Sequence, residues 1–499
     1  MTATTTPTTP NTTYVSDEQR AIVESDARMM LINGAAGSCK TATLCMLCKR
    51  YFAEGKNVLI LTLVGSVTNE IKERIERDVG VKFVQQGNHF INEDGPTHIE
   101  IANYDAALHK QLSVHKDPFL RNYGDCFEQK AQLMYEKYVQ TGKHRHFVMN
   151  NGQVADVLMM DEAQDLAPRK VRILTEILNN HGDMVGIAAG DYMQTIFDHA
   201  FEEGEGHPMD IWREELDATY YPMSRCFRCP KAHVDFINAL LDPYRAASPV
   251  RAESDGDDDP AAKPTTSLPD DAAGAAPEPH RTFRVPPMAP TNDDELHRPV
   301  LFACPPAAMN HSSDIVAHQV ARCIERLREA EPTLVPADVA IIMAKSNRNA
   351  VFRQLEHRLG RLYAEWGFAD AVKVFETKGD GFMRPINWAK AVGKTVMLSV
   401  HGDKGKGHRV VFFLGLTEGT VPSRTRLYTE KELIDLSLLN VALTRSTRWL
   451  FVGFTREFPS RYLRNVKDEL GRYAALSWDP ITYDGTVFEP MLTEMNRCI

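Results

Sequence analysis

Short hydrophobic runs alternate with amphipathic stretches along most of the chain, and this alternation predicts its fold. In the N-terminal half, apolar runs with the length and composition of buried strands lie at 29–33, 57–64, 154–160 and 184–190. Helical periodicity follows the first two runs, to about Phe52 after the first and over 70–77 after the second. This β-α-β-α order is typical of a parallel sheet covered by helices on both faces. We therefore predict an α/β P-loop domain over 14–242, with a small insertion at about 79–154.

The same alternation returns in the C-terminal half and predicts a second α/β domain over 300–499. Its apolar runs lie at 300–303, 339–343, 395–400, 409–414 and 449–452, and its amphipathic stretches lie at 313–330, 349–359 and 430–444. Each domain should have a sheet whose carboxyl edge is available to a ligand.

The segment 243–299 between these domains has a different composition. From Arg251 to Glu295 it contains eleven acidic and four basic residues, together with many Ala and Pro and few large apolar residues. Such a segment cannot bury enough surface to offset its ordering entropy, so we predict a disordered acidic linker. The stretch from Arg251 to Glu295 accounts for −7 of the net charge of −10, and a remainder of −3 is compatible with local basic grooves that bind a polyanion.

The sequence predicts an intracellular protein, cytoplasmic or nuclear, with no membrane partner. No apolar run reaches the length of a membrane span, and the Thr/Pro-rich stretch 1–13 resembles a disordered leader rather than a signal peptide. The nine cysteines should therefore be reduced. Two CxxC pairs, Cys45/Cys48 and Cys226/Cys229, have the spacing of half a zinc site, but the first pair lies one turn apart on an apolar helix, where buried thiols are ordinary core residues.

A glycine-bearing loop between the first predicted strand and helix has the spacing of a phosphate loop. Its residues are Gly34, Ala35, Ala36, Gly37, Ser38, Cys39, Lys40 and Thr41. Backbone N–H groups of such a loop surround a phosphate, Lys40 neutralises its oxygens and the Thr41 hydroxyl ligates Mg²⁺, so we predict ATP and Mg²⁺ as cofactors. Cys39 stands where a glycine is usual, and its Cβ should crowd the phosphate and resist the backbone angles of the loop. The alternative is an ordinary strand-to-helix turn that contains two glycines.

Two further strand ends provide candidate catalytic groups. The run 154–160 ends at Asp161 and Glu162, where one carboxylate can support Mg²⁺ and the other can deprotonate an attacking water. Gln194 follows the next strand and is placed to sense a γ-phosphate. Carboxylates at a strand end that face a phosphate loop are typical of a phosphoryl-transfer site.

Four residues outside these strands are further candidates for the same site. Gln19, ahead of the phosphate loop, can read adenine through its amide; Phe227 offers a ring for stacking and Arg228 a charge for phosphate. Arg445, at the end of a predicted helix, can act as an arginine finger across a domain cleft, or can simply complement the helix dipole.

In this order, the motifs resemble those of the UvrD/Rep family of superfamily 1 DNA helicases. The resemblance extends from Tyr14 to Val452, and its most specific fragments are 161–165, 190–197 and 441–445. It implies two RecA-like domains that bind ATP between them and move, usually 3′ to 5′, along single-stranded or partial duplex DNA in replication, repair or recombination.

The resemblance also implies roles for individual residues. In the ATP site, Gln19 and Phe227 would hold adenine, Lys40 and Thr41 the phosphates and Mg²⁺, and Asp161 the metal; Glu162 would be the catalytic base, and Gln194, Arg228 and Arg445 would contact the γ-phosphate. The implied DNA track consists of Thr62, Asn103, Tyr104, His199, Ser399, His401 and Lys404.

Several positions depart from the family pattern. Besides Cys39, the stretch 64–66 replaces a Thr-Asn-Lys DNA contact, His199 replaces a stacking aromatic residue, and Gly407 replaces a glutamate that meets the ribose. Little sequence remains for the inserted subdomains of full-length relatives. We therefore expect a reduced and slower motor that depends on a replication or repair protein partner.

Two other functions remain open from the sequence. The first is a helicase-like scaffold that binds DNA or a replication partner after Cys39 has impaired ATP turnover. The second is an RNA helicase of a neighbouring superfamily 1 branch, which the stretch 439–445 also resembles, whereas 161–165 favours the DNA branch.

Overall fold

The computed structural model describes the greater part of both predicted α/β regions. The described residues are 15–63, 65–92, 95–116, 127–195, 206–238, 288–291, 297–304, 312–343, 350–375, 388–403, 406–416, 430–455 and 475–476. The predicted leader at 1–13, most of the predicted linker at 243–299, and the candidates His199 and Lys404 lie outside them.

An eight-stranded sheet forms the N-terminal unit, with the strand order β3-β4-β5-β2-β6-β7-β1-β8. Its strands are β1 (Met29–Gly34), β2 (Val58–Thr62), β3 (Phe83–Gln86), β4 (His89–Asn92), β5 (Ile99–Asn103), β6 (Val157–Met160), β7 (Val185–Gly190) and β8 (Thr219–Met223). From β5 to β8 all neighbours are parallel, and β1, β2 and β6 are buried along their whole length. Burial on both faces explains why these strands are continuous apolar runs.

Helices cover both faces of this sheet and bury two separate apolar clusters. One face packs against α1 (Asp17–Val23), α2 (Lys40–Ala53) and α3 (Gly65–Val79). The other face packs against α4 (Tyr104–Val114), α6 (Phe127–Met134), α7 (Pro168–Asn180) and α8 (Pro208–Glu215). Alternate residues of β1 point to opposite clusters, Met29 and Leu31 to one and Met30 and Ile32 to the other.

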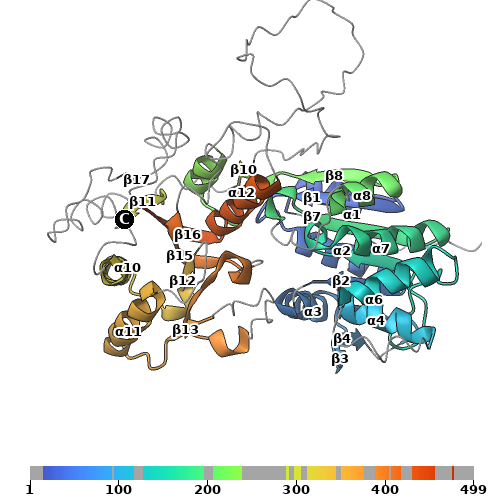
Figure 1. The fold of residues 1–499 in the computed structure, drawn as a ribbon, viewed down its shortest axis with the longest axis horizontal. Helices are drawn as coiled ribbons and strands as arrows, with labels where there is room; N and C mark the ends of the chain where they lie inside the picture. The colour runs from blue at the N-terminus through green and yellow to red at the C-terminus, as the bar shows by residue number, and fades with distance from the viewer. Residues whose placement is uncertain are drawn as a thin grey trace, which may run out of the picture.

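A seven-stranded sheet forms the C-terminal unit, with the order β13-β14-β12-β15-β16-β11-β17 and parallel pairing throughout. Its strands are β11 (Val300–Cys304), β12 (Val339–Met343), β13 (Val372–Val374), β14 (Thr395–Ser399), β15 (His408–Leu416), β16 (Ser446–Thr455) and β17 (Ala475–Leu476). The helices α10 (Ser312–Ala330) and α11 (Ala350–Glu365) pack on one face, which lies away from the N-terminal unit in Figure 1.

The other face of this sheet joins the two units. Its apolar cluster contains Leu398 and Phe413 of the sheet, residues of α12 (Glu430–Leu443), and Ala35 and Ala36 of the predicted phosphate loop. Apolar residues of the helical stretch 231–238, which precedes the predicted linker, belong to the same cluster. Figure 1 shows α12 between the second sheet and the N-terminal unit.

The α/β fold class predicted from the sequence is confirmed, with two differences in detail. The first sheet is mixed rather than parallel, because the hairpin β3–β4 pairs antiparallel with itself and with β5 at one edge. The helix α3 also begins at Gly65, five residues before its predicted start at Glu70. Among the described residues, no helix is both long and apolar enough to cross a membrane.

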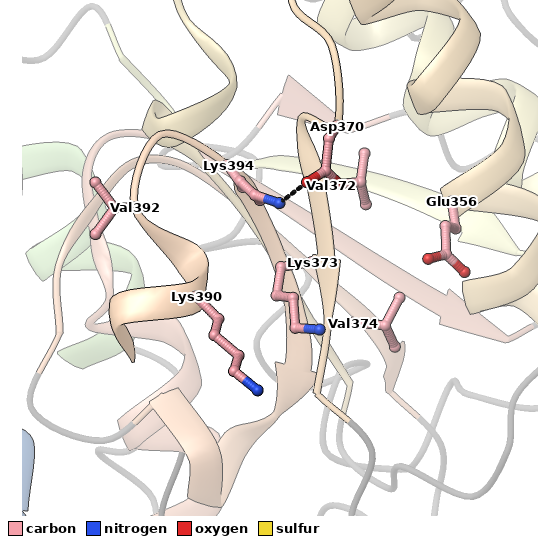
Figure 2. Close-up of a pocket in the computed structure, with 8 residues that line it drawn as sticks. All are labelled: Glu356, Asp370, Val372, Lys373, Val374, Lys390, Val392 and Lys394. Atoms are coloured by element: carbon pink, nitrogen blue, oxygen red, sulfur yellow. Dashed lines mark hydrogen bonds and ion pairs between the residues drawn. The ribbon is translucent and has the colours of Figure 1, made fainter. Parts of the chain in front are cut away.

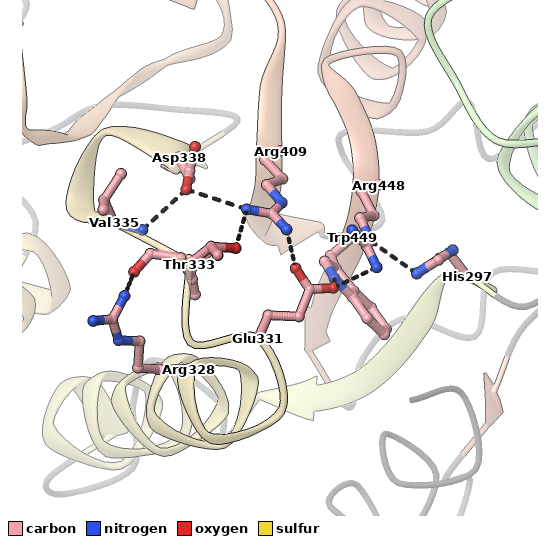
Figure 3. Close-up of polar contacts among 10 residues, drawn as sticks. His297, Arg328, Glu331, Thr333, Val335, Asp338, Arg409, Arg448 and Trp449 are labelled. Carbon is pink, nitrogen blue, oxygen red and sulfur yellow. Dashed lines mark hydrogen bonds and ion pairs between the residues drawn. The ribbon is translucent and has the colours of Figure 1, made fainter.

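A network around Glu331 holds the start of the second sheet together (Figure 3). The carboxylate of Glu331 forms an ion pair with Arg409 and another, of 2.8 Å, with Arg448. It also accepts a hydrogen bond of 3.1 Å from the indole N–H of Trp449, and its side chain is only 11% exposed. One carboxylate therefore ties the end of α10 to β15 and β16.

We predict that Glu331→Ala lowers the free energy of unfolding by about 1–3 kcal/mol, because it removes the acceptor of the buried indole N–H and one partner of each guanidinium group. Chemical denaturation monitored by circular dichroism measures this change. Asp26→Ala is the control, since Asp26 pairs with Arg50 but its side chain is 94% exposed, and it should leave the unfolding midpoint almost unchanged. Equal effects of the two substitutions would contradict a special role for Glu331.

Candidate ATP site

The predicted phosphate loop connects the end of β1 to the start of α2. The Lys40 ammonium lies inside the loop, where it donates to the carbonyls of Gly34 at 2.7 Å and Ala35 at 3.2 Å. A Cβ added to Gly34 would lie 2.4 Å from the Ser38 hydroxyl oxygen, so only glycine fits there. That hydroxyl is buried and has no hydrogen-bond partner among the described residues.

Two loop residues adopt the left-handed conformation. Gly37 has φ +71°, and a Cβ on it would lie 2.6 Å from Cβ of Arg228. Cys39 has φ +69° and precedes α2 without a side-chain cap. The unusual backbone angles anticipated for position 39 are therefore present, in a residue that carries a Cβ. Left-handed backbone costs such a residue about 1–2 kcal/mol.

The strand end after β6 brings a carboxylate to the start of α2. Asp161 is fully buried and accepts a hydrogen bond of 2.8 Å from the hydroxyl of Thr41. Burial, reinforced by the charge of Glu162, raises the pKa of Asp161 to about 7, although Thr41 and Lys40 act in the opposite direction. A carboxylate held in this unfavourable environment is typical of a functional site.

The groups of this loop fit a magnesium nucleotide. Mg²⁺ prefers oxygen ligands, and a hydroxyl and a carboxylate 2.8 Å apart provide two of them. The Lys40 ammonium and the unpartnered Ser38 hydroxyl add donors for phosphate oxygens.

A chain of hydrogen bonds leads from Glu162 across the ends of β6 and β7. The Gln164 amide donates to the Glu162 carboxylate at 2.6 Å, and its oxygen accepts from the backbone N–H of Asp191 at 3.0 Å. The Asp191 carboxylate in turn accepts from the amide of Gln194 at 2.7 Å. Gln164, Asp191 and Gln194 are all buried, so the two bonds among them are protected from water, whereas Glu162 is half-buried.

Arg445 extends this chain into the second unit. It lies between α12 and β16 and is only 1% exposed. Its guanidinium donates to the side-chain oxygen of Gln194 at 2.9 Å and to the carbonyls of Lys406 and Val441. Asn440 makes a second bond across the junction, to the carbonyl of Met193 at 3.0 Å.

The turn that carries Phe227 and Arg228 lies against the phosphate loop. The backbone N–H of Phe227 donates to the carbonyl of Gly37 at 2.9 Å, and Phe227 itself is half-buried. Arg228 donates to the carbonyl of Thr444 at 3.4 Å, next to Arg445. A Cβ on Gly407 would lie 3.5 Å from the guanidinium of Arg228, so the residue that departs from the family pattern faces this arginine.

Gln19 is buried under the loop rather than exposed beside it. Its amide donates to the Thr43 hydroxyl at 3.1 Å, and its oxygen accepts from the Val15 N–H at 3.0 Å. A carboxamide has two N–H groups and two lone pairs, so adenine recognition would use the second of each.

The candidate DNA contacts of the first unit are mostly enclosed. Thr62 is fully buried and shares a 2.6 Å hydrogen bond with Thr68. Asn103 caps α4 and donates to the carbonyl of Leu63. Tyr104 is 1% exposed, with its hydroxyl bonded to a backbone carbonyl of α7, so a direct base contact would require it to leave the core.

In the second unit, the structure describes only part of the candidate DNA track. The Ser399 hydroxyl is buried at the end of β14 without a partner among the described residues. His401 lies in the short helix that follows, but its side chain, like the whole of Lys404 and His199, is outside the described part of the chain. These positions stay predictions.

Gln164 and Asp191 belong to the site but were not among the sequence candidates. Both lie within the fragments that resemble helicases, and this was the available signal. Their partners are a backbone N–H and a neighbouring amide, so no spacing of charged residues indicated their role. Within the described residues, no group of three or more His, Cys, Asp or Glu side chains is arranged to hold a metal, and neither CxxC pair forms part of one.

Comparisons with known proteins give two matches. Residues 18–199 match a family model described as an AAA domain. The chain is also 28% identical over 115 residues to a probable DNA helicase II homolog of Mycoplasma capricolum subsp. capricolum. That match covers 21% of this chain and only 16% of the length of the relative. Together the matches support the resemblance to UvrD/Rep-like superfamily 1 helicases.

We predict that Cys39→Gly raises the free energy of unfolding by about 1 kcal/mol, because glycine adopts the left-handed backbone without strain. Thermal and urea denaturation of the protein without ligands measure this effect. The matched control is Gly37→Ala in the same loop, which should lower stability by about 1–3 kcal/mol through strain and the contact with Arg228. A loss of stability in Cys39→Gly would mean that the thiol contributes packing that outweighs the strain.

Proposed function

Because the chain resembles UvrD/Rep-like superfamily 1 helicases, we propose that it is an ATP-dependent DNA helicase or translocase. ATP hydrolysis would drive movement along single-stranded DNA, in the 3′ to 5′ direction, during replication, repair or recombination. Single-stranded or partial duplex DNA would be the substrate, and a replication or repair protein a partner in unwinding. Such a substrate would place the activity in the cytoplasm or the nucleus.

One observation carries this proposal: a continuous hydrogen-bonded chain joins Glu162, beside the phosphate loop, to Arg445 in the second unit. A nucleotide bound at the loop would lie near the start of this chain. Any displacement of Glu162 or Gln194 would therefore change the contacts of Arg445 in the second unit. This is the connection that a motor needs between hydrolysis and relative movement of two domains.

In the proposed reaction, the chain supplies positioning and charge. Lys40 would neutralise the phosphate oxygens, and Thr41 with Asp161 would hold Mg²⁺, which when bound offsets the negative charge of the phosphates. Glu162 would accept a proton from the attacking water, and the amide of Gln164 holds its carboxylate in place. Gln194, Arg228 and Arg445 would contact the transferred phosphoryl group, while Gln19 and Phe227 would hold the base.

The strained phosphate loop is the observation that favours the alternative function, a helicase-like scaffold with impaired ATP turnover. Cys39 at φ +69° is the feature that favours impaired turnover. Against it, the buried carboxylate Asp161 and the buried Arg445 are costly to retain unless they have a task. Measurements of ATP hydrolysis with DNA and with RNA distinguish the motor, the scaffold and the RNA helicase.

We predict that single-stranded DNA stimulates ATP hydrolysis and that Glu162→Gln lowers kcat by a factor on the order of 10²–10⁴, because a carboxamide cannot accept the proton. Steady-state phosphate release with no nucleic acid, with single-stranded DNA and with RNA measures this. Greater stimulation by RNA would favour the RNA helicase branch. An inactive natural chain in which Cys39→Gly restores DNA-stimulated turnover would favour the scaffold.

For Arg445, we predict that substitution by lysine lowers DNA-stimulated kcat on the order of 100-fold, since one ammonium cannot reach Gln194 and the two carbonyls together. Affinity for ATP, measured by equilibrium titration with a fluorescent analogue, should change much less. Arg322→Lys is the control, because Arg322 pairs with Glu325 of the same helix, α10, and lies outside the candidate site. An unchanged kcat in Arg445→Lys would leave Arg445 as a structural cation at the end of α12.

A further inference from the structure

Two thiols that the proposed reaction does not use lie in one turn beside the phosphate loop. Cys226 ends the short strand β9 (Arg225–Cys226), and Cys229 follows it by three positions, before the helical stretch 231–238. Both are fully buried in the same apolar cluster, and the thiol of Cys229 donates to the carbonyl of Thr444 at 3.6 Å. Two cysteines separated by two residues in one turn have the Cys-x-x-Cys arrangement of thiols that exchange with disulfides.

The two thiols differ in character. The neighbouring Cys229 thiol and the backbone N–H groups of Cys229 and Arg228 stabilise the Cys226 thiolate and lower the pKa of Cys226 to about 6, although burial acts in the opposite direction. The neighbouring Cys226 and burial raise the pKa of Cys229. One sulfur is thus prepared as the nucleophile and the other remains a protonated thiol.

The position of the pair connects it to the candidate ATP site. A Cβ on Gly37 would lie 3.2 Å from the sulfur of Cys226, so the sulfur touches the phosphate loop. Phe227 and Arg228, the two residues between the cysteines, contact Gly37 and Thr444. The sulfur of Cys229 lies 3.6 Å from the carbonyl of Thr444, which precedes Arg445. The turn therefore touches both sides of the junction.

We propose that Cys226 and Cys229 form a reversible disulfide that weakens nucleotide binding, with a small disulfide of the glutathione class as the oxidant. The consequence for binding rests on the proposed function, whereas formation of the bond does not. The disulfide removes the Cys229 S–H, and with it the bond to Thr444. It also tightens the turn that carries Phe227 and Arg228 against the loop.

The reaction balances as two thiol–disulfide exchanges. The Cys226 thiolate attacks one sulfur of the small disulfide, forms a mixed disulfide and releases one small thiolate. Cys229 then loses its proton to that thiolate, attacks the sulfur of Cys226 and releases the second small thiolate, which takes a proton from solvent. The protein loses two thiols, and one small disulfide becomes two small thiols.

Access to the pair depends on the junction between the units. Thr444 covers Cys229 from the second unit, and Thr291 bonds to the backbone carbonyl of Cys226 at 2.9 Å through its hydroxyl. A small disulfide can reach the sulfurs only when these neighbours move away. We therefore expect slow oxidation when the junction is closed.

The test uses the full chain, equilibrated with mixtures of reduced and oxidised glutathione. Cleavage after arginine and lysine separates the peptide Cys226–Arg228 from the peptide Cys229–Lys231. In the oxidised samples, mass spectrometry should show these two peptides joined by a disulfide, with a mass two hydrogens below the sum of the reduced peptides. Binding of a fluorescent ATP analogue, measured on the same samples, should weaken by about tenfold or more and recover with dithiothreitol.

Two serine variants and one control make the result specific. Cys226→Ser and Cys229→Ser should each bind the nucleotide analogue equally well in reduced and oxidised glutathione; serine at 229 keeps a hydroxyl that can donate to Thr444. Cys323→Ala, a buried thiol in the core of the second unit, should retain the sensitivity of the natural chain.

Three results would overturn the proposal: no disulfide within 226–231 under oxidising conditions, a disulfide of Cys226 with Cys39 instead, or a 226–229 disulfide without any change in binding. Failure of the proposed function has a different signature, because the reduced natural chain would then not bind the nucleotide analogue at all. The mass measurement remains informative in that case.

Discussion

The hydrogen-bonded chain from Glu162 to Arg445 is the interaction on which the site depends. Each link uses a side chain that also fixes a strand end: Gln164 holds the backbone of Asp191 and so joins the exits of β6 and β7. Gln194 then accepts from Arg445, whose remaining guanidinium bonds fix it to the second unit. Because these groups are buried, breaking one link leaves a polar group unpaired at a cost of about 1–3 kcal/mol. These directional contacts hold the two units in one arrangement. An apolar cluster that contains Ala35, Ala36 and residues of α12 joins the same two units by burial.

Backbone strain is also present at this site. Cys39 at the loop and Glu162 at the end of β6 are two of the five non-glycine residues with positive φ in the described part of the chain. A residue keeps such a conformation when contacts with its surroundings fix its backbone, and such residues are common at functional sites. Glu162 has such surroundings, since its backbone N–H donates to Asp161 and its carboxylate accepts from Gln164. Cys39 has no side-chain cap bond to compensate it, which makes position 39 the weak point of the loop.

The sequence predicted those parts of the fold and site that depend on local order. The strand, loop and helix around Lys40, and the carboxylates after β6, follow from apolar runs and from residue types at the strand ends. The hairpin β3–β4 escaped prediction because its strands are four residues each and β3 is mostly exposed, so burial left little periodic pattern. Tyr104 shows another limit: a motif match indicated a DNA contact, but only the structure reveals that its ring is enclosed under α7. The bonds among Gln164, Asp191 and Gln194 depend on which strand ends lie side by side, and this is set by the sheet order.

The junction combines two kinds of force that respond differently to movement. Apolar contacts among Ala35, Ala36 and α12 tolerate small sliding, because the hydrophobic effect has no direction. The bonds of Arg445 to Gln194 and of Asn440 to Met193 do not, since a hydrogen bond weakens steeply with angle and distance. A shift of the second unit by a fraction of a side chain would therefore break polar contacts while most apolar burial persisted. Two arrangements of the same pair of units would therefore share most of their apolar burial and differ mainly in polar contacts such as that between Arg445 and Gln194, beside the phosphate loop.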